Sequence, residues 1–145
     1  MPEVRFTIPG EPVGKGRPRF RTIKCKDGRV FNKPYTPAKT RQYEERVKLH
    51  FMEQVGKRLM LECKLEIEIL AVFSIAKSDS KAKRHAKLTQ QLPVTKKPDG
   101  SNILKIVEDG LNLIAYKDDA QITKAAVEKE WGEAPRVVVT LRWED

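Results

Sequence analysis

Carboxylates at Asp99, Asp109, Asp118 and Asp119 surround Lys105 in the stretch KKPDGSNILKIVEDGLNLIAYKDDAQI. The whole chain carries a formal net charge of +9 at pH 7, so its electrostatic field attracts polyanions. Acids on a surface that faces a polyanion would repel it unless a divalent cation lies between them. Oxygen ligands of this kind are the ones that Mg²⁺ prefers. The acids therefore indicate either a metal site or structural roles.

The segment around these acids predicts a loop, a helix and a second, acidic loop. Ser101 is a good N-cap residue, with Asp99 and Gly100 just outside the helix. Apolar residues then form one broad stripe at helical spacing. Gly110 and Asn112 weaken the helix and predict its end.

The same helical spacing places Asn102, Lys105 and Asp109 on a face separate from the apolar stripe. Asp99 then lies at the N-terminal mouth of the helix, and Asp119 arrives from the next segment. Carboxylates that converge in this way suit Mg²⁺, which keeps several of its waters. The alternative is that the acids near the helix serve as cap and dipole partners and that the Asp118–Asp119 pair is solvated. Spacing alone leaves both interpretations open.

Two other segments are rich in basic residues. Residues 13–21, VGKGRPRFR, combine glycines that permit close backbone approach with arginine forks that suit phosphate oxygens. The spacing is not that of a P-loop, so we interpret the segment as a rigid basic loop that contacts nucleic acid, with a solvated surface loop as the alternative. Residues 77–95 predict a short basic helix capped by Ser80, on a flap that faces either DNA or solvent.

Periodicity supplies the remaining elements. We expect strands at 3–8, 65–73, 123–131 and 137–143, and a hairpin over 23–35 that turns at Asp27-Gly28. We also expect a helix that has Thr36 as its N-cap, Pro37 as its first helical residue and its end near Gly56. Its buried face would carry Tyr43, Val47, Phe51 and Val55. These elements predict an α+β fold in which a mixed or antiparallel sheet is packed by two main helices, as a single domain over residues 1–145.

Several classes of protein are excluded or disfavoured by composition. No apolar run approaches the ~18 residues that a membrane span needs, and MPEVRFTIPG contains no signal region, so we expect a cytoplasmic protein without membrane contact. Cys25 and Cys63 are interpreted as free thiols. His50 and His85 have no second metal-ligating residue nearby in the sequence. We expect His50 to lie at the boundary between core and surface and His85 to be solvated.

The motifs described above match a known family pattern. Lys97-Pro98-Asp99, Asn102, Lys105, Asp109, Leu111-Asn112 and Tyr116-Lys117-Asp118-Asp119-Ala120-Gln121-Ile122 resemble the signature of the RusA-like Holliday-junction resolvases, or crossover junction endodeoxyribonucleases. The resemblance extends to the Gly-Lys-Gly-Arg-Pro-Arg loop, the basic segment at 77–84 and the late Gly132-Glu133 and Pro135-Arg136 pairs.

This resemblance implies a homodimeric, Mg²⁺-dependent endonuclease, with Mn²⁺ as an alternative ion, that resolves four-way DNA junctions in recombination and repair. Such proteins are often carried by phages or prophages and act in the cytoplasm of a bacterial or phage-infected cell. It implies catalytic roles for Asp99, Asp119 and Lys105, and metal contacts from Asp99, Asp118, Asp119 and position 101. The branched DNA would be held through Lys15, Arg17, Arg19, Lys81, Lys83, Arg84, Lys96 and Lys97.

Two positions depart from the family pattern. Ser101 stands where the family has a catalytic aspartate, and Leu113 stands where a glycine is usual. The first departure leads us to expect impaired cleavage in an intact fold. Two alternatives follow: a weakened protein that binds branched DNA with the same fold, and an unrelated RNA- or DNA-binding module whose acids are structural.

Overall fold

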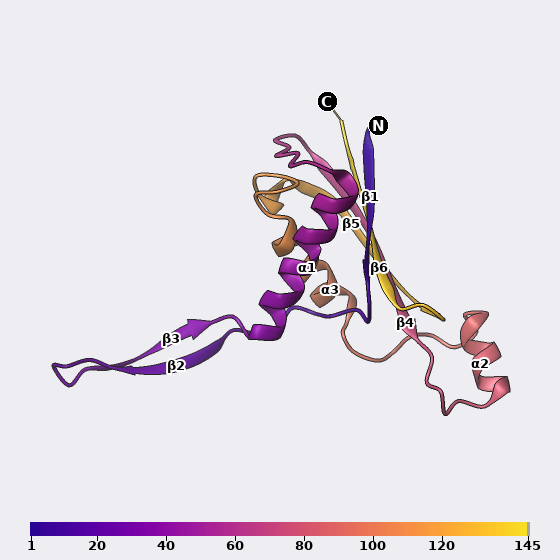
Figure 1. Cartoon of the computed structure of the whole chain (residues 1–145), viewed down its shortest axis with the longest axis horizontal. Helices are drawn as coiled ribbons and strands as arrows, with labels where there is room; N and C mark the ends of the chain where they lie inside the picture. The colour runs from indigo at the N-terminus through magenta and orange to yellow at the C-terminus, as the bar shows by residue number, and fades with distance from the viewer. Residues whose placement is uncertain (145) are drawn as a thin grey trace.

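The computed structural model describes residues 1–144 (Figure 1). Its elements are β1 (Glu3–Pro9), β2 (Arg19–Lys24), β3 (Val30–Tyr35), α1 (Ala38–Val55), β4 (Leu65–Ser74), α2 (Lys81–Leu88), α3 (Gly100–Leu111), the 3₁₀ turn η1 (Asp119–Gln121), β5 (Ile122–Gly132) and β6 (Arg136–Trp143). No helix in this part of the chain is both long and apolar enough to cross a membrane.

Four strands form the main sheet, in the order β1-β6-β4-β5. The β4 and β5 strands run parallel, while β6 is antiparallel to both β1 and β4. Helices α1 and α3 lie together against one face of this sheet (Figure 1). The chain thus has the predicted α+β architecture, a mixed sheet packed by two main helices.

The core forms between this sheet face and the two helices. The alternation predicted for 65–73 buries Leu65, Ile67, Ile69 and Phe73 in the central strand β4. The four-residue repeat of α1 buries Tyr43, Val47 and Phe51, and the Phe51 ring meets the Phe6 ring edge-on at 5.3 Å. The rigid platform that results carries α3 and the loops at its ends.

Helix α1 starts one residue later than predicted and ends where predicted. The first helical residue is Ala38, and Pro37, expected at that position, occupies the N-cap with extended backbone. Thr36 therefore lies outside the cap, and the N-cap carries no side-chain hydrogen bond. Gly56 ends the helix in the left-handed region at φ 90°, with its N–H bonded to the Met52 carbonyl.

The observed hairpin is longer than the one that the sequence predicted over residues 23–35. Its first strand begins at Arg19 rather than at residue 23, so Arg19 and Arg21 lie in a strand and not in the basic loop. The Asp27-Gly28 turn is confirmed, with the Gly28 N–H bonded to the Cys25 carbonyl. Figure 1 shows the hairpin as an arm that projects away from the sheet and helices.

Candidate nucleic-acid interface and active site

Helix α3 is capped by Asp99 and not, as predicted, by Ser101. The Asp99 backbone is extended, and its Oδ1 accepts a hydrogen bond of 3.0 Å from the Asn102 N–H. Aspartate and serine cap about equally well, so local sequence could not choose between them. Ser101 instead lies in the first turn of α3, where its hydroxyl donates to Asp99 Oδ1 at 3.4 Å.

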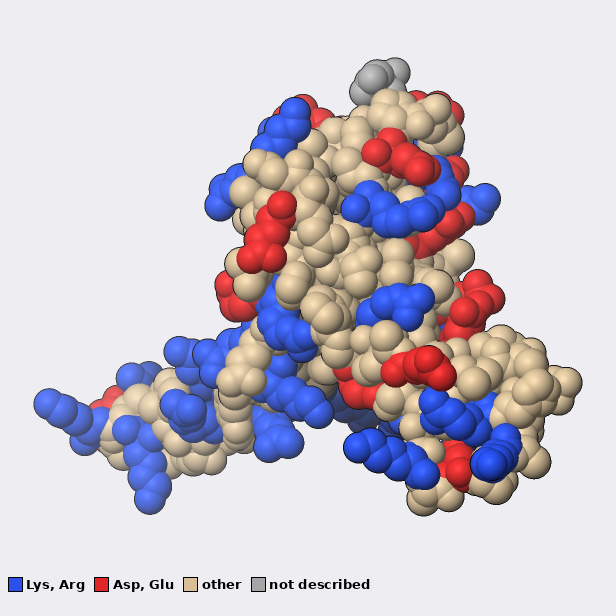
Figure 2. All heavy atoms as spheres, turned by 45° about the vertical axis from the view of Figure 1, so that its right-hand side comes forward, with Lys and Arg blue, Asp and Glu red and all other residues tan. Residues whose placement is uncertain are grey.

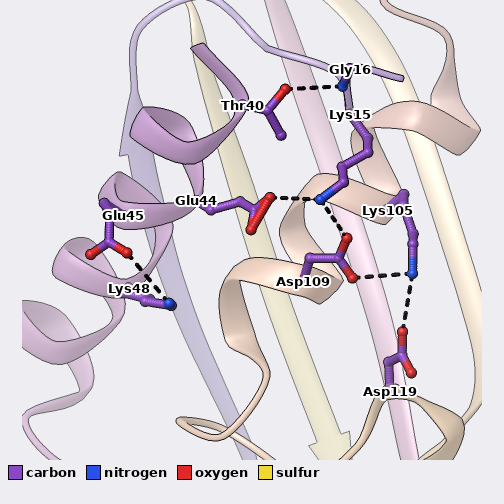
Figure 3. Close-up of polar contacts among 9 residues, drawn as sticks. All are labelled: Lys15, Gly16, Thr40, Glu44, Glu45, Lys48, Lys105, Asp109 and Asp119. Atoms are coloured by element: carbon purple, nitrogen blue, oxygen red, sulfur yellow. Dashed lines mark hydrogen bonds and ion pairs between the residues drawn. The ribbon is translucent and has the colours of Figure 1, made fainter. Parts of the chain in front are cut away.

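One turn further along α3, acids and lysines alternate in space. The Lys105 ammonium lies 3.1 Å from Asp109 and 3.5 Å from Asp119, and the Lys15 ammonium lies 2.9 Å from Asp109 and 2.7 Å from Glu44 (Figure 3). Each lysine therefore lies between two carboxylates, and Asp109 joins the two lysines. The prediction that Asp109 and Lys105 share a helix face is confirmed.

These contacts hold both lysines in the charged form. Partial burial would lower the pKa of Lys15, but its bonds with Glu44 and Asp109 outweigh burial and raise the pKa above its usual value. The bond with Asp109 raises the pKa of Lys105 in the same way, against a smaller lowering by burial. Burial alone would raise the pKa of Asp109, but Lys15 and Lys105 hold it below its usual range. A fixed positive charge thus lies beside Asp119.

Gln121 fastens the acidic loop that carries Asp119. Its side-chain amide donates to the carbonyls of Leu61 and Cys63 at 2.8 and 2.9 Å, and its Oε1 accepts from the N–H groups of Lys117 and Asp118. The family pattern includes a glutamine at this place, but sequence reasoning assigned it no role. Glu44 was also missed, because its partner Lys15 lies on a different element and no local spacing links them.

The glycines flanking Lys15 allow its loop to approach both helices closely. A Cβ on Gly14 would lie 2.6 Å from the Pro98 Cβ, and one on Gly16 would lie 2.7 Å from the Thr40 hydroxyl oxygen. Backbone hydrogen bonds fix the loop there, from Lys15 N–H to the Asn102 carbonyl at 2.9 Å and from Gly16 N–H to the Thr40 hydroxyl at 3.1 Å. The loop is therefore anchored to the N-terminal ends of α1 and α3.

Between this loop and the α3 N-terminus lies an open groove of about 910 Å³. Its lining includes the cations Arg17, Arg19, Lys39 and Lys97 and the acid Asp99. The groove thus brings cations that can bind phosphates next to one predicted catalytic acid. Lys15 also lines it, although its ammonium is engaged by Glu44 and Asp109; its predicted phosphate contact stays a prediction.

A second basic surface surrounds α2, whose predicted cap Ser80 accepts the Lys83 N–H at 3.2 Å. Lys81 and Lys83 are exposed, while Arg84 is paired with Glu133 at 3.2 Å. Figure 2 shows Lys and Arg side chains gathered on the arm and around the lower end of the molecule, with α2 on the side away from the arm.

Trp131, in the edge strand β5, anchors the segment around α2 that was predicted as a flap over residues 77–95. The Lys87 and Lys96 ammonium groups lie over the Trp131 ring at 4.3 and 5.6 Å from its centroid. The Gln90 side chain bonds the Trp131 backbone through both its oxygen and its nitrogen. Of the predicted DNA contacts here, Lys96 is therefore partly committed to packing.

The sequence led us to expect two or three converging carboxylates, and a group of three is not found in the described part of the chain. Within residues 1–144, no group of three or more His, Cys, Asp or Glu side chains is close enough to hold a metal ion. Asp119 faces Lys105, and Asp99 caps its own helix. Asp118 is exposed at the start of η1. The donors still fit a hard ion, because Mg²⁺ is ordinarily held by one or two carboxylates together with water and substrate phosphates.

Comparison with known proteins agrees with this arrangement. The family model described as "Endodeoxyribonuclease RusA" matches residues 9–142, which include the arm, the groove, α3 and the acidic loop. The chain is also 32% identical over 140 residues to the "Uncharacterized protein YqaN" of Bacillus subtilis (strain 168), covering 96% of this chain and 95% of that protein.

Proposed function

Because the chain belongs to the RusA endodeoxyribonuclease family, we propose that it hydrolyses phosphodiester bonds in four-way DNA junctions with the help of Mg²⁺. The observation that carries this proposal is the basic groove that Asp99 lines, beside the helix that presents Lys105 to Asp119. Nucleases of this family generally depend on a divalent metal. The four-way junction, the choice of Mg²⁺ over Mn²⁺ and the residue roles are the proposed part.

Each residue has a physical role in this proposal. Asp99 and Asp119, with Asp118 nearby, would hold the ion through carboxylate oxygens. When bound, the ion would supply an activated water and would stabilise negative charge at the scissile phosphate. Lys105 stabilises the negative charge that develops on the phosphate. Asp109 orients Lys105 through the 3.1 Å contact and keeps it protonated. Arg17, Arg19 and Lys97 position the DNA backbone.

We propose in addition that the protein acts as a homodimer. A junction offers two equivalent strands, and an isologous dimer offers two equivalent sites. On the sheet face without helices, Leu70 and Val138 lie half-buried in a shallow groove of about 400 Å³ rimmed by Arg5, Glu68 and Glu128. A second copy would cover these apolar side chains. Sedimentation of DNA-free protein at micromolar concentration tests this, and a monomer would contradict it.

A second candidate function has its own support. Ser101 replaces an acid of the family pattern, and its hydroxyl is a neutral, weaker ligand than a carboxylate. The same fold would then bind junctions while cutting them slowly or not at all.

A junction cleavage assay separates these functions. The protein is incubated with a labelled synthetic four-way junction, with and without Mg²⁺, beside Asp119→Asn. Metal-dependent, paired cuts that the variant lacks support the resolvase. Tight junction binding without cuts supports the weakened binder. Equal affinity for junction and single-stranded RNA, without cuts, contradicts both.

The groove has a separate test based on salt. Arg17→Ala with Arg19→Ala should lower affinity for all branched sequences alike and reduce the slope of log K against log salt by about 0.9 for each phosphate that is no longer neutralised. The matched control replaces the exposed Lys57 and Lys64, in the segment after α1, by alanine. If both double variants change the slope equally, the groove is not the interface.

A further inference from the structure

The arm formed by β2 and β3 is unusual in what it exposes. Phe20, Val30, Phe31 and Tyr35 are 67%, 59%, 49% and 39% exposed. These are large apolar side chains on a ribbon that stands away from the core (Figure 1). Exposed apolar groups that cluster on one element mark a surface that a partner covers.

The charge of the arm identifies the kind of partner. Residues 19–35 contain one acid, Asp27, and six cations: Arg19, Arg21, Lys24, Lys26, Arg29 and Lys33. The acid is already paired with Arg29 at 2.7 Å. Figure 2 shows Lys and Arg side chains spread along the projecting arm, with little acidic surface among them. A strongly cationic ribbon with interspersed aromatic rings suits a nucleic acid.

The register divides the arm into two faces. Directly opposed residues share a face, so Arg19, Arg21 and Lys33 lie together with Tyr35, and the Ile23–Phe31 pair follows on that same face toward the tip. The Arg21 guanidinium lies 5.2 Å from the Tyr35 ring centroid. We call this set of six residues the cationic face.

The root of the arm fixes its direction relative to the candidate site. The first strand follows directly on the loop that is hydrogen-bonded to Asn102 and Thr40, and the second strand ends just before α1. Arg19, the first residue of the arm, lines the same groove as Asp99. Nucleic acid bound along the arm would therefore be continuous with nucleic acid in the groove.

From these observations we propose that the arm is a DNA-binding ribbon that enters the major groove of a duplex next to the cleavage site, with the cationic face on the phosphates and bases. A two-stranded β-ribbon fits a major groove about 12 Å wide. Six residues of strand extend about 20 Å, which is enough to reach several base pairs beyond the groove at Asp99. This inference rests on the proposed function, because it supplies that site with a duplex-binding element.

Two variants, at the exposed residues Arg21, Lys33 and Phe31, test the cationic and apolar parts separately. Arg21→Gln with Lys33→Gln should lower duplex and junction affinity at least about 10-fold at low salt and reduce the salt slope by up to about 1.8, because two phosphates would no longer be neutralised. Phe31→Ser should lower affinity without changing the salt slope, because it removes apolar contact only. Lys57→Gln with Lys64→Gln serves as the charge-matched control.

A shortened arm extends the test beyond point changes. Replacing residues 23–31 by Asn-Gly joins the opposed residues Thr22 and Asn32 through a two-residue turn that suits a hairpin. The stretch of duplex that the bound protein protects from chemical cleavage of the DNA backbone should be shorter, on one side only, with the shortened arm than with the parent protein. Binding is read by fluorescence anisotropy, so the result does not depend on whether the parent protein cuts.

The outcomes distinguish the arm from the proposed function. Reduced duplex affinity and a shortened footprint support the ribbon, whether or not junctions are cleaved. Normal affinity, slope and footprint in all three arm variants overturn it, even if the parent cleaves junctions efficiently. Weaker self-association in sedimentation together with unchanged affinity for DNA also overturns it, because the arm would then cover a second copy of the chain.

Discussion

Gly110 in α3 packs directly against Val47 in α1. A Cβ built at Gly110 would lie 2.8 Å from the Val47 Cβ, closer than side chains approach, and 3.3 Å from the Glu44 carbonyl oxygen, which is a tight contact. The sequence predicted that Gly110 and Asn112 end α3, and the helix does end at Leu111 with Asn112 as its C-cap, but it continues through Gly110. The residue is a contact point between the helices that carry Asp109 and Glu44, and not a helix terminator.

Gly110→Ala is therefore expected to destabilise the fold. In an uncrowded helix interior alanine is favoured over glycine by about 0.5–1 kcal/mol. Here overpacking against Val47 should reverse the sign and lower the free energy of unfolding by about 1–3 kcal/mol. Gly100→Ala in the same helix is the control, because its Cβ would meet Val127 at an ordinary 3.6 Å. Chemical denaturation measures both, and a stabilised Gly110→Ala would contradict the contact.

Leu113 explains why a glycine is usual at its position in the family. It has a backbone φ of 64°, in the left-handed region, and its side chain is 60% exposed. An L-residue there costs about 1–2 kcal/mol, which glycine avoids.

Replacing Leu113 by glycine should raise the free energy of unfolding by up to about 1 kcal/mol, because the relief of strain exceeds the greater freedom of glycine in the unfolded chain. Leu113→Ala keeps the Cβ and should gain nothing. Thermal unfolding of both variants compares them. Equal melting temperatures would mean that the backbone at this position is not strained.

Particular residues show how much of the structure could be predicted from the sequence. The strand at 65–73 and the stripe of Tyr43, Val47 and Phe51 were correctly predicted, because alternation along the strand and one-sided burial of the helix each leave a local period. The choice of Asp99 over Ser101 as the cap could not be predicted, since both residues cap well and adjacent positions compete.

Contacts between distant segments left no signal at all. Lys15 meets Asp109, and Gly110 meets Val47, only because the fold brings their elements together. The exposed arm was predicted only as a hairpin over residues 23–35, since no local pattern distinguishes a strand that projects from one that packs.

Neighbouring acids on α3 should respond to pH in opposite directions. Burial and the charge of Asp119 raise the pKa of Glu108, whereas Lys15 and Lys105 overcome burial and lower that of Asp109. A carboxyl group whose pKa is lowered in the folded state stabilises the protein at pH values above its pKa in the unfolded chain, about 3.9 for aspartate. This stabilisation is lost as pH falls through the folded-state pKa. A carboxyl group with a raised folded pKa destabilises the protein increasingly as pH rises from about 4.3 through the folded pKa.

Asp109→Asn should thus lower the free energy of unfolding at pH 7 by about 1.5–3 kcal/mol, the range for hydrogen bonds to charged groups. The difference should shrink as pH falls below the usual range of aspartate. Glu108→Gln should instead be slightly more stable than the parent at pH 7, and equal to it at low pH. Denaturation curves between pH 2.5 and 7 test both signs, and a parallel response of the two variants would contradict these pKa shifts.

Ser101 is the position at which the proposed chemistry can be tested most directly. It lies exposed in the first turn of α3, with its hydroxyl 3.4 Å from Asp99 Oδ1. An aspartate there adds a carboxylate beside Asp99, which strengthens a site for a hard cation. The helix N-terminus favours the added charge, while repulsion by Asp99 opposes it, so stability should change little. Asp99 retains its capping bond in either case.

We therefore expect Ser101→Asp to raise Mg²⁺-dependent cleavage of a four-way junction at least ~10-fold, equivalent to about 1.4 kcal/mol in the barrier. Junction affinity without metal should stay level or fall slightly, because the added charge faces phosphates. Ser101→Asn, of similar size but neutral, should give no gain, which separates the effect of charge from that of shape. If the parent already cuts efficiently and Ser101→Asp adds nothing, position 101 is not a ligand, and metal binding at the site would depend on Asp99, Asp118 and Asp119 alone.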